Sequence, residues 1–346
     1  MISNIVLLFS LWRRYFTIVS FYEKFLFCFW PIVSYHKNDL SIMNLGFSES
    51  NGVSHISTFC SEEDVMLSGE YPENCLYWSL VFYDTIGRAF ASVEQSDFPL
   101  RKYQIVVSQK QFAKQTIRHI CPPSKYFSVI QRIYSAPYTT LFPQYLPCIE
   151  YSNKGVVYDV SPIQRVQNSM ELQKSFQTLL SLEDCNIPDL QEQVNLHQFF
   201  LPGQTYMERF FLNPQALILF AFPKRGKIMK IKGTLPNVGC DSFLQYISFM
   251  TCDFSSTVTD DSISYFELPY DYEIFISDNQ IALYDEGYDY TLSWNPRTKH
   301  PVVVMYLILS SFQSITPRHF LKSDTPVDGS EIREWFGDMI PQIYHE

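Results

Sequence analysis

The side chains best suited to catalysis in this sequence are carboxylates, and four of them are candidates: Glu150, Asp253, Asp260 and Asp261. Two carboxyl groups held about 5 Å apart, or roughly 6.5–9.5 Å apart, can together cleave a glycosidic bond. A hydrolase-type enzyme acting on a carbohydrate or lipid-like ligand would need a cleft between two domains that brings such a pair together. Carboxylates scattered over a solvated surface would remove this hypothesis.

The acidic pair Asp260-Asp261 also raises the question of a metal ion. It follows Thr257-Val258-Thr259, and a loop of this kind can bind calcium through carboxylates and carbonyl groups. A polar β-turn explains the pair better. The seven histidines never occur at the spacing of metal ligands, and none of the eight cysteines forms a C-x-x-C pair. We therefore predict no metal site and no cofactor.

Two other local patterns could carry a function. Cys121-Pro122-Pro123 lies near His119, and a cysteine–histidine pair can act as a nucleophile where a positive, structured niche favours the thiolate. The two prolines instead predict a stiff loop. Trp294 could stack on a sugar, but a turn anchored by a buried tryptophan is the better interpretation. The G-x-S-x-G elbow, the P-loop and G-x-G-x-x-G are also absent from the sequence, so no catalytic residue is predicted.

The composition indicates two globular domains built mainly from strands. The chain has 346 residues, which is enough for two domains with sizeable cores. Aromatic residues make up 16% of the chain, and such side chains fit a pleated, half-buried surface. The net charge of −10 argues against a nucleic-acid partner, because binding to phosphates needs a basic face.

An internal repeat relates the two halves of the chain. The segment 76–84 matches 245–253, and 103–108 matches 272–277, both at an offset of 169 residues. Gly69–Pro72 and the segment 125–135 find weaker counterparts at Gly233–Pro236 and 299–310. A period of this size corresponds to a whole domain. We therefore predict a tandem duplication.

The alternation of side chains along the repeated segments predicts which residues are buried. In the first copy, Trp78 points into a core and Tyr77 to the opposite face. Tyr103, Ile105 and Val107 should be inward, as should their counterparts in the second copy. Such half-buried alternation is typical of antiparallel sheets with one face in water.

The predicted fold is mainly β. It consists of two tandem antiparallel β-sandwich domains, jelly-roll-like and related by the duplication, at residues 43–152 and 206–315. A helical connector at 153–205 joins them. A C-terminal tail at 316–346 carries a helix over Glu331–Met339, whose apolar stripe is formed by Ile332, Trp335 and Phe336.

Two finer predictions concern the second copy and the connector. The basic run Lys224-Arg225-Gly226-Lys227 is interpreted as a hairpin turn between strands at 216–222 and 228–231, with Gly226 supplying the positive φ. In the connector, Ser161-Pro162 is a good helix start, and Leu190–His197 favours a second, shorter helix.

Residues 1–42 form a hydrophobic N-terminal segment that differs from the rest. Most of it is apolar, but Arg13-Arg14 and Glu23-Lys24 interrupt it. Charges in the middle of a membrane span are costly, so an interfacial or tilted placement fits better than a clean span. We predict membrane association through this segment. The alternatives are a helix that docks on the chain's own sandwich, in a protein of the cytoplasm, and an upstream extension with the working start at Met43.

The segment Tyr77-Trp78-Ser79-Leu80-Val81-Phe82-Tyr83-Asp84 resembles part of a known family. With Cys121-Pro122-Pro123, Arg132-Ile133-Tyr134 and Leu146-Pro147-Cys148-Ile149-Glu150, it is similar to the carboxyl-terminal jelly-roll-like domain of the bacterial proteins called domain of unknown function twelve-fourteen. The resemblance covers residues 69–150, with a weaker second copy at 206–315. It implies a β-sandwich and no established catalytic residue. The second copy departs from it, since Ile247 replaces Trp78 and no L-P-x-I-E sequence closes it.

The sequence therefore favours a non-catalytic binding or structural module, with a protein or a carbohydrate as its ligand. The alternatives are the hydrolase-type enzyme described above and a viral capsid-like structural protein, because tandem jelly rolls also occur in capsids. The oligomeric state is not predicted.

Overall fold

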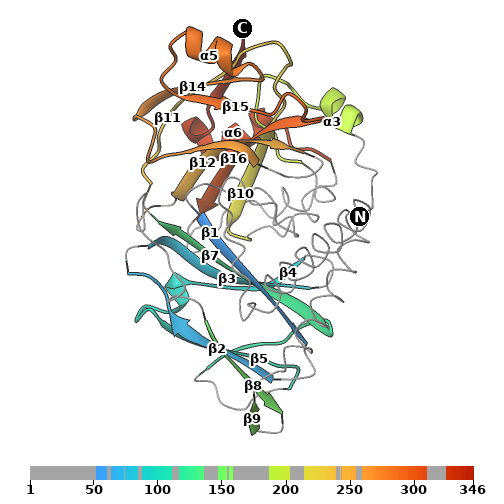
Figure 1. The fold of residues 1–346 in the computed structure, drawn as a ribbon, viewed down its shortest axis with the longest axis vertical. Helices are drawn as coiled ribbons and strands as arrows, with labels where there is room; N and C mark the ends of the chain where they lie inside the picture. The colour runs from blue at the N-terminus through green and yellow to red at the C-terminus, as the bar shows by residue number, and fades with distance from the viewer. Residues whose placement is uncertain are drawn as a thin grey trace, which may run out of the picture.

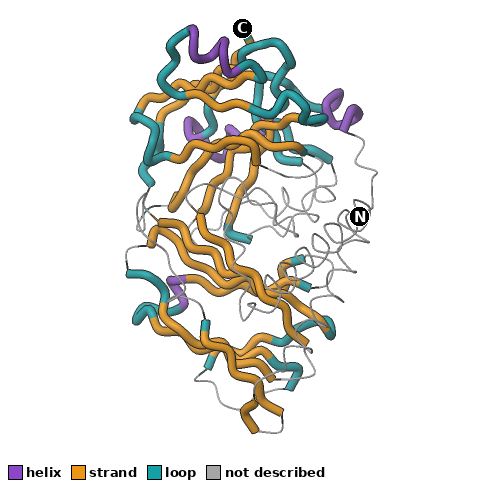
Figure 2. The backbone as a smooth tube through the Cα atoms, viewed as in Figure 1, coloured by secondary structure: helices purple, strands orange, loops and turns teal. Residues whose placement is uncertain are grey.

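The computed structural model describes the chain in thirteen ranges, which are residues 52–60, 64–73, 75–84, 88–110, 117–135, 147–153, 156–158, 187–202, 214–238, 242, 244–254, 259–309 and 325–346. Within these ranges the chain forms four β-sheets that stack as four layers (Figures 1 and 2). The first two layers form one sandwich and the last two form another. The mainly β fold with two tandem sandwiches is thus confirmed.

The first sandwich comprises an outer and an inner sheet. The first inner sheet has the strand order β1-β7-β3-β4, and the first outer sheet has the order β6-β5-β2-β8-β9. Its strands are β1 (Gly52–Cys60), β2 (Asp64–Glu70), β3 (Cys75–Tyr83), β4 (Ala89–Glu94), β5 (Lys102–Val107), β6 (Arg118–Ile120), β7 (Tyr126–Ser135), β8 (Cys148–Asn153) and β9 (Val156–Tyr158). Since β9 pairs with β8, the sandwich extends past the predicted boundary at residue 152.

The second sandwich repeats this plan. Its inner sheet has the order β10-β16-β12-β13, and its outer sheet has the order β15-β14-β11-β17. The strands are β10 (Ala216–Ala221), β11 (Met229–Thr234), β12 (Leu244–Asp253), β13 (Thr259–Ser264), β14 (Asp271–Ser277), β15 (Thr291–Ser293), β16 (Pro301–Leu309) and β17 (Gln342–His345).

The two copies share strand order and irregularities. If each of β1 to β7 is matched with the strand nine places later, and β8 with β17, both inner sheets and the first four strands of both outer sheets have the same order. The register of β3 shifts between Cys75 and Tyr77, and that of β12 shifts between Leu244 and Tyr246, which is the same place at the offset of 169. A second register shift is also shared: it lies between Phe82 and Tyr83 where β3 pairs with β4, and between Thr251 and Cys252 where β12 pairs with β13. Bulges are specific features of a fold, so the duplication is well supported.

Each outer sheet contains one short parallel pair, which the sequence did not predict. Strand β6 runs parallel to β5, and β15 runs parallel to β14. The remaining pairs are antiparallel. The parallel pair therefore belongs to the repeated plan.

A glycine–tyrosine contact also recurs. Gly69 pairs with Tyr103 across β2 and β5, and Gly233 pairs with Tyr272 across β11 and β14. A Cβ atom placed on either glycine would lie 2.6 Å from the hydroxyl oxygen of the paired tyrosine. Both tyrosine rings thus fill space that only a glycine leaves open.

The closing strand of the second copy lies further along the chain than the sequence suggested. Strand β17 pairs with β11 as β8 pairs with β2, and Ile343 opposite Ile231 corresponds to Ile149 opposite Leu67. The sequence before and within β17, Ile340-Pro341-Gln342-Ile343, thus repeats Leu146-Pro147-Cys148-Ile149. The second copy has no exact L-P-x-I-E sequence, but this related sequence stands in its place, and the C-terminal tail completes the second sandwich.

Strands β5 and β14 of the outer sheets show the predicted half-buried alternation, whereas the central strands of the inner sheets, β3 with β7 and β12 with β16, are buried on both faces. Trp78, Leu80 and Phe82 fill the core of the first sandwich, whereas Tyr77 on the opposite face belongs to a third apolar cluster. That cluster joins the sandwiches, because it also contains Tyr134 of β7 and residues of the second inner sheet such as Tyr246 and Tyr306. Alternation marks a core face, but it cannot show that the other face is covered by a second domain.

The connection at Lys224–Lys227 is a turn, but it does not close a hairpin. Gly226 has a φ of +68°, and the amide of Lys227 donates to the carbonyl of Lys224. The flanking strands β10 and β11 belong to different sheets, so the turn crosses from the inner to the outer layer of the sandwich.

Three α-helices are described. Helix α3 (Ile187–Gln193) begins earlier than the helix predicted there, and α5 (Gln280–Asp285) was not predicted. Helix α6 (Gly329–Phe336) has Asp328 as its N-cap and continues into a 3₁₀ turn, η5 (Gly337–Met339). Another 3₁₀ turn, η1 (Gln95–Asp97), follows β4. Ile332 and Phe336 are buried as predicted, but Trp335 is half exposed and does not belong to the buried stripe.

Two predictions fall outside the described residues. One is the association of residues 1–42 with a membrane, and the other is the connector helix that starts at Ser161-Pro162. Among the residues that the structure does describe, no helix has the length and apolar character needed to cross a membrane.

Candidate functional site

A groove of about 940 Å³ lies at one end of the second outer sheet. Its first side is formed by the end of β11 and the residues that follow it, Lys232 to Pro236, and its second by Tyr270 to Glu273 at the start of β14. The third side comes from the C-terminal tail: Arg333, Phe336, and Asp338 to Gln342. This volume falls within the range of about 300–1,000 Å³ that is typical of ligand sites.

The third side of the groove, which is its wall, is held in place because α6 packs against the core of the second sandwich. Ile332 and Phe336 are buried with Ile340 and Ile343 in the core cluster of the second sandwich. The guanidinium of Arg333 donates to the carbonyl of Ile340 at 2.8 Å, which ties the helix to the segment that leads into β17. The groove is thus held between a sheet end and a fixed helix, which favours a preformed site.

The charged groups of the groove are already engaged with one another. Glu273 accepts from Lys230 at 2.7 Å and from Lys232 at 2.9 Å. These two hydrogen bonds hold the pKa of Glu273 below its usual value, and the hydrogen bond to Glu273 raises the pKa of Lys232. Asp271 accepts from the hydroxyl of Thr234 at 3.0 Å. A general acid needs a raised pKa, so Glu273 is tuned in the wrong direction for that role.

Two tyrosines of the groove differ sharply in exposure. The Tyr272 hydroxyl is buried against Gly233 and has no hydrogen-bond partner, and burial raises its pKa. Tyr103 of the first copy shares all these features, so the buried tyrosine hydroxyl is part of the repeated fold and is not specific to the groove. Tyr270, in contrast, lines the groove with 71% of its surface exposed. Of the apolar and aromatic residues that line the groove, it is the one that is exposed.

The corresponding place in the first copy is occupied by an ion-pair cluster. The amide of Leu235 donates to the carbonyl of Tyr270 in the second copy, and that of Tyr71 donates to Arg101 in the first. Arg101 therefore stands where Tyr270 stands in the second copy, and its guanidinium contacts Glu70 at 2.6 Å and Glu73 at 3.2 Å. The connection before the closing strand is also much shorter there, at residues 136–147 compared with 310–341.

The four carboxylates proposed from the sequence do not line this groove. Glu150 lies in β8 of the first sandwich, whereas Asp253, Asp260 and Asp261 lie on β12 and β13 of the second. Asp260 accepts from the amide of Asn295 and from the hydroxyl of Thr298, both at 3.1 Å. Burial is the main cause of its raised pKa.

The acidic pair thus holds a loop in place. The second carboxylate, Asp261, accepts from the amide of Ser293 at 3.3 Å. Both aspartates belong to β13, so the predicted polar turn is wrong at this point. The loop that they hold includes Trp294, which is 2% exposed and anchors it, as predicted. Within the described ranges, no three His, Cys, Asp or Glu side chains are arranged to hold a metal ion.

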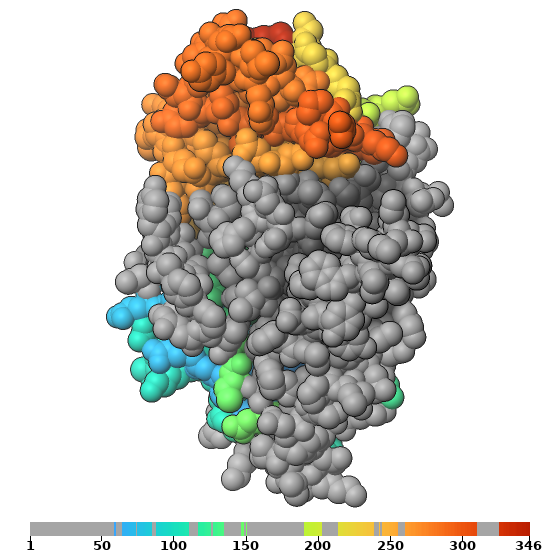
Figure 3. Space-filling model, in the orientation of Figure 1, coloured from blue at the N-terminus to red at the C-terminus, as the bar shows by residue number. Residues whose placement is uncertain are grey.

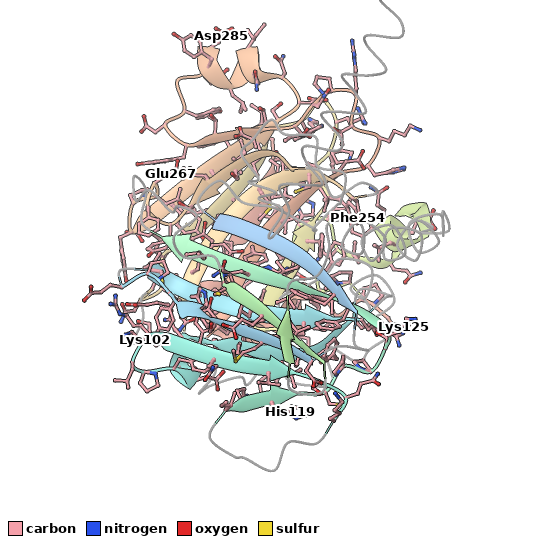
Figure 4. The ribbon with its side chains drawn as sticks, turned by 60° about the horizontal axis from the view of Figure 1, so that its bottom comes forward. Lys102, His119, Lys125, Phe254, Glu267 and Asp285 are labelled. Carbon is pink, nitrogen blue, oxygen red and sulfur yellow. The ribbon has the colours of Figure 1, made fainter. Side chains whose placement is uncertain are left out.

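The candidate cysteine–histidine pair, Cys121 and His119, does not line the groove either. His119 is on β6 of the first sandwich, at the opposite end of the molecule from Asp285 of the second (Figure 4). Its Nε2 atom lies 3.1 Å from the carbonyl oxygen of Ser108. Cys121 is exposed, which does not provide the structured niche that an activated thiolate needs.

A buried polar cluster lies between the two sandwiches. Arg132 is 5% exposed and donates to the Tyr83 hydroxyl at 2.8 Å. Burial tends to lower the pKa of Arg132, but Tyr83, Tyr306 and Tyr134 outweigh it and the net direction is upward. The Tyr134 hydroxyl donates to that of Tyr306 at 3.4 Å, and the Tyr134 ring lies 4.8 Å from that of Tyr246. These contacts fix the orientation of the inner sheets and are structural.

The sequence did not indicate the groove, because its three sides come from separate segments. One signal was available: the sequence Ile340-Pro341-Gln342-Ile343 repeats the closing sequence of the first copy at a longer offset. It would have shown that the second copy carries an insertion before its last strand, and insertions are common places for binding sites.

One comparison with a solved structure supports the fold. A crystal structure of an uncharacterised protein from Burkholderia cenocepacia aligns with a TM-score of 0.55 and 9% identity, over 92% of this chain and 80% of that one. A structure of a protein from Vibrio parahaemolyticus aligns with a TM-score of 0.44 and 10% identity, over 87% and 90%. No family model and no curated protein matches the chain. At 9% identity, the first likeness shows that the fold of both sandwiches together is shared with a solved structure, and no more.

Proposed function

We propose that the chain is a non-catalytic binding protein in which the groove of the second sandwich holds the ligand. The observation that carries this proposal is the charge arrangement of the groove, in which Lys230 and Lys232 keep Glu273 ionised. A pair of carboxylates with separated pKa values would be expected in a hydrolase. The groove instead offers a fixed wall, an exposed tyrosine and paired charges, which suit recognition.

The test uses Met339, which lines the groove, as a reporter. The full chain would be labelled with ¹³C in its methionine methyl groups, and the Met339 signal would be assigned with the Met339→Leu variant. Met250, which is buried between the sandwiches, provides the internal control. The probes are cellohexaose, maltohexaose, hexagalacturonate and hexalysine.

The proposal predicts that at least one probe shifts the Met339 signal in a saturable manner, leaves Met250 unchanged and is recovered intact. If no probe shifts Met339, the groove is not a binding site of this kind. Cleavage of a probe by the wild-type chain would favour the hydrolase-type alternative.

The proposal includes two further points. The first sandwich is related to the domain of unknown function twelve-fourteen, and residues 1–42 associate with a membrane. If that association holds, the second sandwich, which forms one end of the molecule (Figure 3), presents the groove on a membrane-bound protein. Fractionation of the full chain and of a chain starting at Met43 tests this part. Equal amounts of both in the soluble fraction would contradict it.

A further inference from the structure

We infer that the ligand of the groove is a neutral oligosaccharide, with Tyr270 as the aromatic platform on which one sugar ring stacks. This inference rests on the proposed function and adds the chemical class of the ligand. It is carried by the balance of charges in the groove, by the exposure of Tyr270 and by the difference between the two copies at this position.

The charges of the groove disfavour an ionic ligand. Two basic residues, Lys232 and Arg333, and three acidic residues line the groove, so the two signs nearly balance; the acidic residues are Asp271, Glu273 and Asp338. Glu273 is already shared between two lysines, and Arg333 is bonded to a carbonyl. A strongly charged ligand would have to displace these contacts. Hydroxyl groups can donate to the free lone pairs of the carboxylates and accept from the lysine without breaking an ion pair.

The aromatic group provides the complementary apolar contact. The ring of Tyr270 is 71% exposed, and beside it the groove is lined by Leu235, Pro236, Met339 and Pro341. Pyranose rings present a face of C–H groups to aromatic side chains and a rim of hydroxyls to polar ones. Tyrosine suits this contact, because it offers a large, rigid surface that loses little conformational entropy on binding.

The first copy shows that the exposed tyrosine is not required by the fold. Arg101 occupies the equivalent position, with the same backbone hydrogen bond, and its side chain is tied to Glu70 and Glu73. The sandwich therefore accepts a polar residue here. At this position, the exposed aromatic ring occurs in the copy that also has the longer connection and the helix α6.

The experiment measures the dissociation constants of cellohexaose and maltohexaose for the full chain by following Met339. Tyr270→Ala should weaken the tighter of the two at least tenfold, whereas Tyr270→Phe should retain the affinity, because it keeps the ring. Tyr284→Ala is the matched control, since Tyr284 is 85% exposed but does not line the groove. Binding should change less than twofold between 20 and 500 mM NaCl, because salt screens only interactions between charges.

The outcomes separate the inference from the proposed function. If hexagalacturonate or hexalysine shifts Met339 while the neutral sugars do not, or if binding weakens with salt, the ligand is ionic and the inference is wrong, but the groove still binds. Equal affinity of Tyr270→Ala and wild type for a neutral sugar would also overturn the role of Tyr270. If no probe shifts Met339, both the inference and the proposed function fail.

Discussion

The two sandwiches of this chain can be compared directly, because they are two copies of one strand arrangement. The strand orders, the two register shifts in the middle strand, the parallel edge pair and the glycine–tyrosine contact recur in both. The copies differ before the closing strand, where the second carries α6 and η5. The shared features maintain the fold, and the insertion adds the third side of the groove. The proposed ligand site thus lies where one copy has added to a common scaffold.

The largest effect expected from this comparison is on stability, and it concerns the central strands β3 and β12 of the two inner sheets. Trp78 is fully buried and lies 5.2 Å from Tyr71 and 4.8 Å from Tyr103 between ring centroids. Trp78→Ala should lower the free energy of unfolding by about 3–5 kcal/mol, and Ile247→Ala, its counterpart, by about 2–5 kcal/mol. Denaturant unfolding of the full chain measures both. An unchanged midpoint for Trp78→Ala would contradict the burial of this face.

A smaller effect distinguishes the two glycines. Gly69→Ala places a Cβ atom 2.8 Å from the ring carbon Cζ of Tyr103, and Gly233→Ala does the same at Tyr272 but also meets Pro341 at 2.9 Å. Overpacking of this kind costs about 1–3 kcal/mol. We expect Gly233→Ala to be the more destabilising variant, because a proline ring cannot turn away.

Thermal unfolding of both alanine variants provides the measurement for this pair. If Gly69→Ala were as stable as wild type, the tyrosine contact would not be a constraint shared by the copies. Gly233→Ala should also shift the Met339 signal, because Pro341 lines the groove.

The smallest effect is pH-dependent and belongs to the second copy alone. His345 of β17 lies opposite Met229, where the first copy has Tyr151 opposite Val65. Its Nε2 atom lies 2.9 Å from the carbonyl of Leu196, whereas its Nδ1 atom is buried without a partner. Burial lowers the pKa of His345, and the charges of Lys224 and His197 act in the same direction.

The unfolded chain therefore binds more protons than the folded one below the usual histidine pKa of about 6.5. Stability from this group is complete above that pH and is lost as the pH falls through the lower folded pKa. His345→Gln should flatten this part of the profile of melting temperature against pH between about 7 and 5. A profile that remains as steep in the variant would assign the slope to other groups.

Much of this architecture could be predicted from the sequence, because it depends on local patterns. The alternation around Trp78 and Tyr103 identified the core faces, and the constant offset identified the repeat. The prediction failed where distant segments meet. Tyr77 looks like a residue facing solvent until the second sandwich covers it, and Trp335 fits the apolar stripe of its helix but lies at its exposed edge.

The candidate site could not be predicted for the same reason. Asp260 and Asp261 attract attention as an acidic pair, yet they bond to the backbone and side chains of a neighbouring loop. Tyr270 carries no motif, and its environment is formed by a helix about 60 residues further along the chain. The pairing of β17 with β11 confirms that this helix is an insertion into the second copy, which the repeat of the closing sequence at a longer offset could have indicated.

If the ligand binds in the groove of the second sandwich and nowhere else, each chain has one site, and the number of sites per chain distinguishes the two copies. Calorimetric titration of the full chain with the neutral hexasaccharide that shifts Met339 should give one site per chain, and Tyr270→Ala should weaken it at least tenfold while Arg101→Gln leaves it unchanged. Two equivalent sites, or a single site sensitive to Arg101→Gln and not to Tyr270→Ala, would contradict the division of roles between the copies.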